Sequence, residues 1–276
     1  MALALALLGV ACTRLAGADD LVRTVQVLET THGIRFGIWG NPPSTPAPTL
    51  IILANTIEGT LGDPYFRQSG TSLASNGFLC ASIDLPCHGQ LRRAQEPLEL
   101  VGWRSRCERG EDVVAESNAR LGEVLDHLVA AGYTDAARVA VCGTSRGGFL
   151  ALHFAAADDR ARCAAAFAPV TDLAALREFR GAETNALVRD LALAAQADAL
   201  AGRPVWIVIG DQDTRVGTDR AIDLAHRIGR AARSQGLENR VELHVVPEPR
   251  GHTTPDGAID QAAEWIQRQL MIGIPK

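Results

Sequence analysis

Short runs of consecutive apolar residues recur along the chain and alternate with longer segments of helical periodicity. Such runs, rich in Val, Ile, Leu and Ala, are typical of strands buried on both faces of a parallel sheet. They cover residues 49–54, 78–83, 139–142, 164–167, 205–209 and 241–246. Two earlier segments, residues 22–28 and 34–39, flank the turn residues His32 and Gly33 and predict a β-hairpin.

Helical segments fill the gaps between these strands. The clearest spans residues 111–131, where apolar residues recur three or four positions apart before Gly132. Further helices are predicted over residues 65–75, 147–157, 218–234 and 256–270. Alternating strands and helices predict an α/β fold: a mostly parallel, doubly wound sheet of eight strands with helices on both faces.

Length and composition favour one domain over residues 19–276. Of the 276 residues 47% are hydrophobic, and no Gly/Ser-rich linker divides the chain. Residues 170–203, between the sixth and seventh strands, are the expected place for a small helical lid. The leucines of this segment either line a pocket under the lid or pack in the core: Leu187, Leu191 and Leu193.

The amino terminus has the form of an export signal. Residues 2–12 are apolar but too short to span a bilayer, and Ala16-Gly17-Ala18 has the small-x-small form of a cleavage site. These features predict a signal peptide over residues 1–18 and a periplasmic or extracellular protein. No Lys or Arg precedes the apolar run, so the alternative is a helix packed on a cytoplasmic domain.

Charge and cysteines exclude other classes of function. The net charge of -5, with arginines scattered among acids, argues against nucleic-acid binding. No CxxC motif or Cys/His cluster has metal-ligand spacing, so neither a metal nor a cofactor is predicted. Cys87 and Cys107 fall in loop-like segments and could form a disulfide in an oxidising compartment. The oligomeric state cannot be read from the sequence.

Gly143-Thr144-Ser145-Arg146-Gly147 connects a predicted strand to a predicted helix. This spacing matches the G-x-S-x-G nucleophile elbow, a tight turn that exposes a serine hydroxyl above the sheet edge. Glycines flank the serine because side chains there would collide with the neighbouring strand and helix. Because such a motif also occurs by chance, the prediction of a nucleophilic Ser145 depends on finding its partners.

Two acids and a histidine follow later strands in the required order. Asp211 and Asp213 come after the strand at residues 205–209, and His252 comes after the last strand. A histidine can take the serine proton, and a buried carboxylate can fix the imidazole. His252 is therefore the predicted base, with His88, which also follows a strand, as its one serious rival.

Backbone N–H groups must stabilise the negative charge that develops on the substrate oxygen. One donor is predicted at Arg146, the residue after the nucleophile. The second should come from the loop after the strand at residues 49–54. Thr56 is preferred there, with Ile57 as the alternative.

With these motifs the chain resembles the α/β-hydrolase superfamily, nearest to dienelactone-hydrolase-like and prolyl-oligopeptidase-like esterases. Residues 84–89 are similar to the D-x-P-x-H-G segment of such proteins. Gly210, Asp213 and Val216 resemble a G-x-x-D-x-x-V pattern, which implies that Asp213 rather than Asp211 is the triad acid. Many relatives have His-Gly where this chain has Ala54-Asn55, so the oxyanion loop departs from the pattern.

The resemblance implies a serine esterase that acts on a small-molecule ester through an acyl-enzyme. A peptidase or amidase could use the same residues, although a prolyl oligopeptidase would normally add a propeller domain. An acyltransferase, a perhydrolase and a non-catalytic binding protein are further alternatives. Trp103 either lines the acyl pocket or packs in the core.

Overall fold

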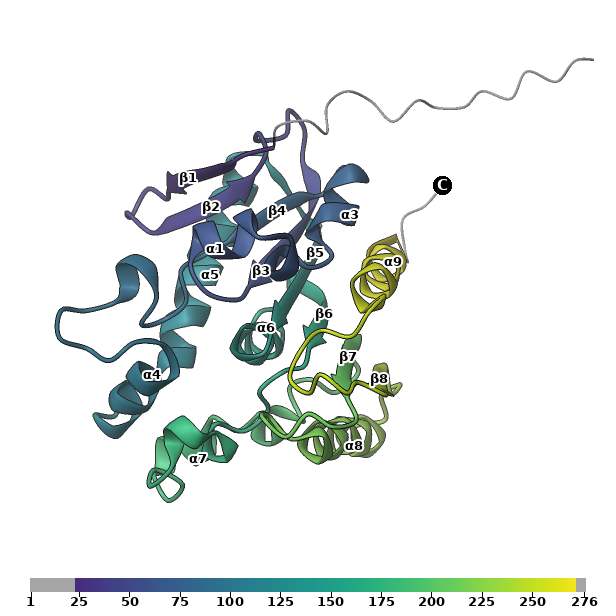
Figure 1. Ribbon diagram of the computed structural model, residues 1–276. Coiled ribbons are helices and arrows are strands. Elements are labelled where there is room, and N and C mark those ends of the chain that lie inside the picture. The colour runs from purple at the N-terminus through teal and green to yellow at the C-terminus, as the bar shows by residue number, and fades with distance from the viewer. Residues whose placement is uncertain (1–22, 272–276) are drawn as a thin grey trace, which may run out of the picture.

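The computed structural model describes residues 23–271, in which eight strands form a single sheet. The predicted signal peptide lies outside these residues. The strand order is β1-β2-β4-β3-β5-β6-β7-β8, antiparallel from β1 to β4 through β2 and parallel elsewhere (Figure 1). The strands are β1 Val25–Glu29, β2 Arg35–Trp39, β3 Ala47–Leu53, β4 Leu79–Ser82, β5 Thr134–Thr144, β6 Ala161–Phe167, β7 Val205–Gly210 and β8 Val241–Val246.

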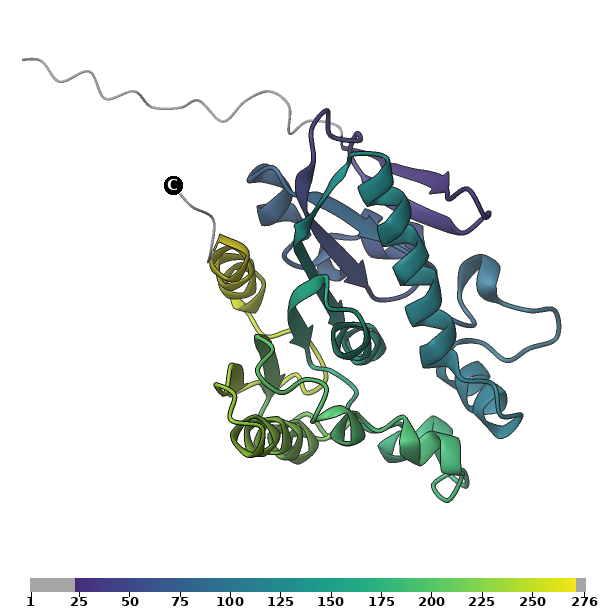
Figure 2. The same cartoon turned by 180° about the vertical axis from the view of Figure 1, so that it is seen from behind.

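Helices cover both faces of the sheet. One face carries α1, α3 and α9, and the other carries α5, α6 and α8, so α9 and α6 lie on opposite sides (Figures 1 and 2). Over residues 23–271 no helix is both long and apolar enough to cross a membrane. The α-helices are α1 Ile57–Gly62, α2 Pro64–Arg67, α3 Gly70–Ser75, α4 Glu99–Glu108, α5 Val113–Ala130, α6 Arg146–Ala157, α7 Ala186–Asp190, α8 Thr218–Ser234 and α9 Ala258–Met271.

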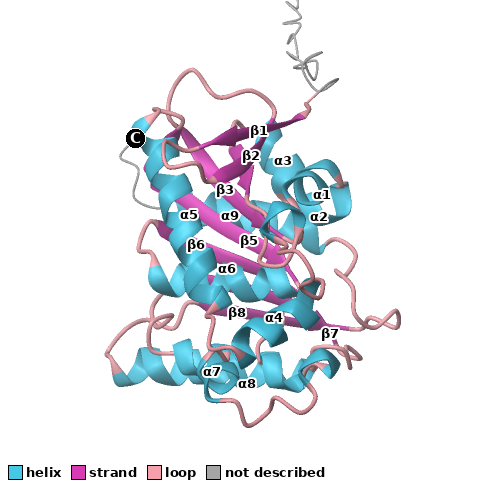
Figure 3. Ribbon diagram, turned by 90° about the vertical axis from the view of Figure 1, so that its left-hand side faces the viewer, coloured by secondary structure: helices cyan, strands magenta, loops and turns pink. Residues whose placement is uncertain are grey.

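The apolar runs form strands because both faces of the central sheet are covered (Figure 3). All six residues of β7 are buried, whereas β8 at the sheet edge is only partly buried. The predicted doubly wound, mostly parallel sheet is therefore confirmed, including the antiparallel hairpin at its start.

Three helical segments differ from expectation. The helix predicted over residues 65–75 is interrupted at Gln68, whose φ of 52° separates α2 from α3. The loop after β3 contains the short helix α1, capped by the Thr56 hydroxyl. The segment that looked loop-like around Trp103 and Cys107 is α4, in which both side chains are buried.

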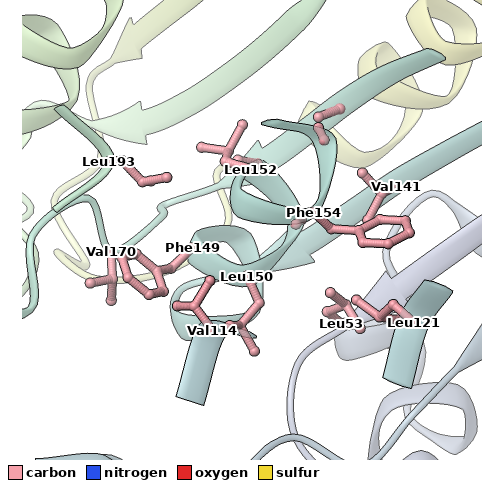
Figure 4. Close-up of a cluster of buried hydrophobic side chains, with 14 of the residues drawn as sticks. Leu53, Val114, Leu121, Val141, Phe149, Leu150, Leu152, Phe154, Val170 and Leu193 are labelled. Atoms are coloured by element: carbon pink, nitrogen blue, oxygen red, sulfur yellow. The ribbon is translucent and has the colours of Figure 1, made fainter. Parts of the chain in front are cut away.

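Residues 170–203 pack onto the main core. Leu193 is fully buried and Leu191 nearly so, while Leu187 packs against the same cluster from its edge. Figure 4 shows Val170 and Leu193 beside α6, near Phe149 and Leu152. Of the two predicted alternatives, these leucines therefore pack in the core and do not line a pocket under a lid.

We expect Leu193→Ala to lower the free energy of unfolding by about 2–5 kcal/mol, because it removes a fully buried side chain from this core. Denaturant unfolding of the full chain measures the change. Leu98→Ala is the matched control: Leu98 is 54% exposed, and its truncation should change stability by less than ~0.5 kcal/mol. Equal small effects of both substitutions would show that the segment does not pack as described.

Candidate active site

Ser145 occupies a strained turn between β5 and α6. Its φ of 54° and ψ of -116° lie in a region that L-residues rarely adopt. The backbone is held there by hydrogen bonds on both sides: the Ser145 N–H donates to the Phe167 carbonyl at 2.9 Å. The Ser145 carbonyl accepts the N–H groups of Phe149 and Val170, each at 3.1 Å. The predicted elbow is therefore present.

Close backbone approach explains the two glycines of the motif. A Cβ on Gly147 would overlap the carbonyl group of Leu53 at the end of β3. A Cβ on Gly143 would overlap the backbone of Gly147 and Gly148. Because backbone atoms cannot move aside as a flexible side chain would, β3, β5 and α6 can meet at this point only through glycine.

The structure brings the predicted serine, histidine and aspartate together. The Nε2 atom of His252 lies 3.0 Å from Ser145 Oγ, and its Nδ1 atom lies 2.8 Å from Asp213 Oδ2. Residues 39 and 107 positions apart thus form one continuous chain of hydrogen bonds. A neutral imidazole that donates from Nδ1 to the carboxylate presents its Nε2 lone pair to the serine hydroxyl.

The two aspartates after β7 have different surroundings. The Asp213 side chain is completely buried, and its Oδ1 accepts the N–H groups of Arg215 and Val216 at 3.0 and 3.2 Å. These bonds orient the carboxylate so that Oδ2 faces His252. Asp211 is exposed and accepts the N–H of Glu248 at 2.9 Å instead. It therefore connects this loop to the loop that carries His252.

His88, the rival base, has a different neighbourhood. Its Nδ1 lies 2.8 Å from the Pro86 carbonyl, and its Nε2 has no hydrogen-bond partner among the described residues. Burial, followed by the positive charge of Arg146, lowers the pKa of its imidazole. The structure does not bring it together with Ser145 or either aspartate.

The loop after β3, residues 54–59, is held by Asp84. The Ile57 N–H donates to Asp84 Oδ1 at 2.8 Å, so the alternative oxyanion donor is already engaged. Asp84 Oδ2 accepts from Gln90 and Arg35. A Cβ on Gly89 would overlap the Asp84 carboxylate, which explains why this D-x-P-x-H-G segment ends in glycine.

The two predicted oxyanion donors, Thr56 and Arg146, both lie at helix N-termini. Thr56 is the N-cap of α1, and its hydroxyl, not its N–H, caps the helix by accepting from Gly59. Arg146 is the first residue of α6, where backbone N–H groups lack intrahelical acceptors. Its guanidinium contacts the Ala54 carbonyl and pairs with Glu99 of α4 at 2.7 Å. This side chain thus connects the elbow to the loop after β3.

The remaining candidates near the site are structural. Trp103 is fully buried, donates to the Pro86 carbonyl at 2.6 Å and packs against Phe149. Cys87 and Cys107 are buried free thiols without a disulfide in the described part of the chain. Burial raises the pKa of Cys87 to about 12. Over residues 23–271 no group of three His, Cys, Asp or Glu side chains has metal-binding geometry.

The carboxyl-terminal half of the chain matches a known family. The model described as the prolyl oligopeptidase family matches residues 121–270, more than half of the 276 residues. The chain belongs to the prolyl oligopeptidase family. The matched span contains Ser145, Asp213 and His252 and begins after the oxyanion loop. No curated protein matches the sequence significantly.

Solved structures with a similar fold include peptidases and esterases. Dipeptidyl peptidase 4 of Porphyromonas gingivalis is 16% identical with a TM-score of 0.64, over 89% of this chain and 35% of that protein. A cold-adapted esterase from an Arctic intertidal metagenomic library is 18% identical with a TM-score of 0.61, over 89% and 92%. The Pyrococcus furiosus esterase Pf2001 is 17% identical with a TM-score of 0.60, over 94% and 96%.

The chain therefore spans about a third of the peptidase and nearly all of each esterase. The predicted α/β-hydrolase fold is confirmed. Together with the match to the prolyl oligopeptidase family, it identifies a serine hydrolase.

The sequence did not reveal several side chains that contact the site. Asp84 lies in a recognisable motif, but its hydrogen bond to the loop after β3 was not predicted. Tyr65 and Gln68 have no sequence signal, because their partners are almost 190 positions away. These partners lie in the histidine loop, residues 247–257, which connects β8 to α9 and carries His252. Long-range polar contacts of this kind have no local pattern.

We expect Gly147→Ala to prevent stable folding or to lower the unfolding free energy by more than ~3 kcal/mol, because the new Cβ overlaps backbone atoms of β3. Thermal unfolding followed by circular dichroism measures the effect.

Gly62→Ala is the matched control, because a Cβ there meets no atom within 4 Å. Replacing this helical glycine should leave stability unchanged or raise it by up to ~1 kcal/mol. A Gly147→Ala protein as stable as the control would contradict the close approach.

Proposed function

We propose that this prolyl oligopeptidase family member hydrolyses carboxylic esters of small molecules. In this proposal Ser145 is the nucleophile, His252 the general base and Asp213 the acid that orients the imidazole. The backbone N–H groups of Arg146 and Thr56 form the oxyanion hole. The observation that carries the proposal is the hydrogen-bonded chain from Ser145 Oγ through His252 to Asp213.

In this proposal each step of acyl transfer is assigned to one of these groups. Ser145 Oγ attacks the ester carbonyl while His252 Nε2 takes its proton, and the oxygen becomes negatively charged between the two N–H donors. Collapse of this intermediate expels the alcohol, which receives the proton from His252. Water then attacks the acyl-enzyme while His252 takes one of its protons. His252 passes this proton to Ser145 Oγ as the carboxylic acid leaves, which regenerates both residues.

An ester substrate is the first candidate, because the fold is shared with the two esterases named above. Amide hydrolysis is the second candidate, because the family is that of prolyl oligopeptidase and the fold is shared with a dipeptidyl peptidase. The same proposed residues would serve both reactions.

We also infer that residues 170–203 form a small cap within one domain over residues 19–276. Its backbone begins beside the elbow, where Val170 donates to the Ser145 carbonyl. Glu178 of this segment accepts from Arg215 of the acid loop at 2.8 Å. These contacts support a cap that is fixed to both the elbow and the acid loop.

Ser145→Ala should lower ester turnover by roughly 10⁴-fold or more, because the nucleophile is lost. A panel of p-nitrophenyl esters of graded chain length and labelling with a fluorophosphonate probe measure this. The control Ser234→Ala, on α8, should behave as the unmodified protein. Labelling or turnover that survives in Ser145→Ala would refute the assignment of Ser145 as the nucleophile. A protein inert to every ester that cleaves aminoacyl amides would establish the second candidate.

Asp213→Asn should lower kcat by roughly 10⁴-fold, since an amide in place of the carboxylate no longer fixes the imidazole tautomer. Asp211→Asn makes the same chemical change two residues away and keeps an oxygen that can accept from Glu248. It should retain kcat within about 10-fold. Steady-state ester hydrolysis compares the two variants, and a larger loss in Asp211→Asn would reverse the assignment of the acid.

A further inference from the structure

Gln68 contacts the end of β5, directly before the proposed nucleophile, and the loop that carries the proposed base. Its side chain is buried, with the residue only 1% exposed. The Nε2 atom lies 2.7 Å from Thr144 Oγ1 and 3.2 Å from Thr254 Oγ1. Thr144 immediately precedes the nucleophile, and Thr254 is two residues beyond His252. The two N–H groups of this amide are shared among these two hydroxyls and the Tyr65 carbonyl, so one amide spans the end of β5 and the loop that carries His252.

The same short segment holds the histidine loop at a second point. The Tyr65 hydroxyl accepts the Thr254 N–H at 3.2 Å and lies 3.3 Å from Thr253 Oγ1. The Tyr65 carbonyl lies 2.6 Å from Gln68 Nε2, which fixes the amide relative to the tyrosine. Residues 65–68 thus contact the two residues directly after His252, Thr253 and Thr254, through hydrogen bonds.

Gln68 holds this position at a local energetic cost. Its φ of 52° and ψ of -134° lie in a region where glycine is favoured over residues with a Cβ. Its Oε1 is buried without a hydrogen-bond partner among the described residues. A residue that strains the backbone and leaves a buried oxygen unpaired, yet contacts two reactive loops, fits a role in positioning.

The other contacts of the histidine loop do not fix its position relative to β5 as Gln68 does. The histidine loop is joined to the acid loop by the bond from the Glu248 N–H to Asp211, and Glu248 pairs with Arg250 within the loop. These contacts set His252 relative to Asp213. The distance from His252 to Ser145 also depends on where the loop lies relative to the end of β5, and Gln68 spans that gap.

We propose that Gln68 is a positioning residue that sets the distance between His252 and Ser145 by bonding to Thr254 and Thr144. This inference rests on the proposed function for its kinetic consequences and on the structure alone for its geometric ones. Proton transfer requires the two atoms to stay within hydrogen-bond reach, and small misplacements of catalytic groups cost large factors in rate.

Gln68→Gly tests the proposal because it removes the amide and relieves the backbone at once. We expect kcat for a p-nitrophenyl ester to fall about 10- to 100-fold with KM changed less than about 3-fold. The melting temperature should stay within about 4 °C of the unmodified protein, since relief of the strained backbone opposes the loss of hydrogen bonds. A merely structural residue would instead lose stability and activity together.

Gln95→Gly is the matched control. Gln95 also has a positive φ, of 63°, but it is exposed and makes no side-chain hydrogen bond within the described residues. The kcat of the Gln95→Gly variant should equal that of the unmodified protein. A second variant, Thr144→Val with Thr254→Val, keeps Gln68 and removes both acceptors with little change of shape. It should reproduce the fall in kcat, and adding Gln68→Gly to it should cost little more.

Crystal structures of the unmodified protein and Gln68→Gly separate this inference from the proposed function. The distance of 3.0 Å between His252 Nε2 and Ser145 Oγ should lengthen beyond hydrogen-bond reach in the variant. An unmodified protein without hydrolytic activity would refute the proposed function, and the measured distance would still decide the role of Gln68. An unchanged distance, or a kcat equal to that of Gln95→Gly, would overturn the inference.

Discussion

The close contact among β3, β5 and α6 is the constraint on which the rest of the site depends. Gly147 lies directly against the Leu53 carbonyl, and Gly143 lies against Gly147, so two strands and a helix meet without side chains between them. This contact sets Ser145 at the carboxyl edge of the sheet in a backbone conformation that costs about 1–3 kcal/mol. Three backbone hydrogen bonds to Ser145 offset that strain. The hydroxyl is therefore fixed by packing that starts in the core.

Two carboxylates help to fix the loops around the serine relative to their neighbours. Asp84 holds the loop after β3 through the Ile57 N–H, and Asp211 holds the loop that carries His252 through the Glu248 N–H. A carboxylate that accepts a backbone N–H makes a strong and directional hydrogen bond. Each carboxylate joins segments that follow different strands: Asp84 follows β4 and bonds the segment after β3, and Asp211 follows β7 and bonds the segment after β8.

The regular elements of this fold could be predicted from the sequence because each has a strong local pattern. Continuous apolar runs identified the buried strands. The order of serine, acid and histidine identified Ser145, His252 and a pair of aspartates, and the resemblance to a family pattern chose Asp213 from that pair. Helix α4 was missed because its buried residues, among them Trp103 and Cys107, do not form one apolar stripe and Gly102 interrupts it. The break at Gln68 was missed because a glutamine, not a glycine, adopts the positive φ.

Asp211 and Asp213 show why a sequence motif alone does not decide which of two neighbouring acids contacts the histidine. Asp211 and Asp213 follow the same strand two positions apart, and from sequence they differed only through resemblance to a pattern. Their roles diverge because the turn after Gly210 directs two backbone N–H groups to Asp213 Oδ1 and leaves Asp211 facing the next loop. One acid orients the imidazole while the other orients the loop that carries it. A single turn thus holds His252 directly through its imidazole and its loop through the backbone N–H of Glu248.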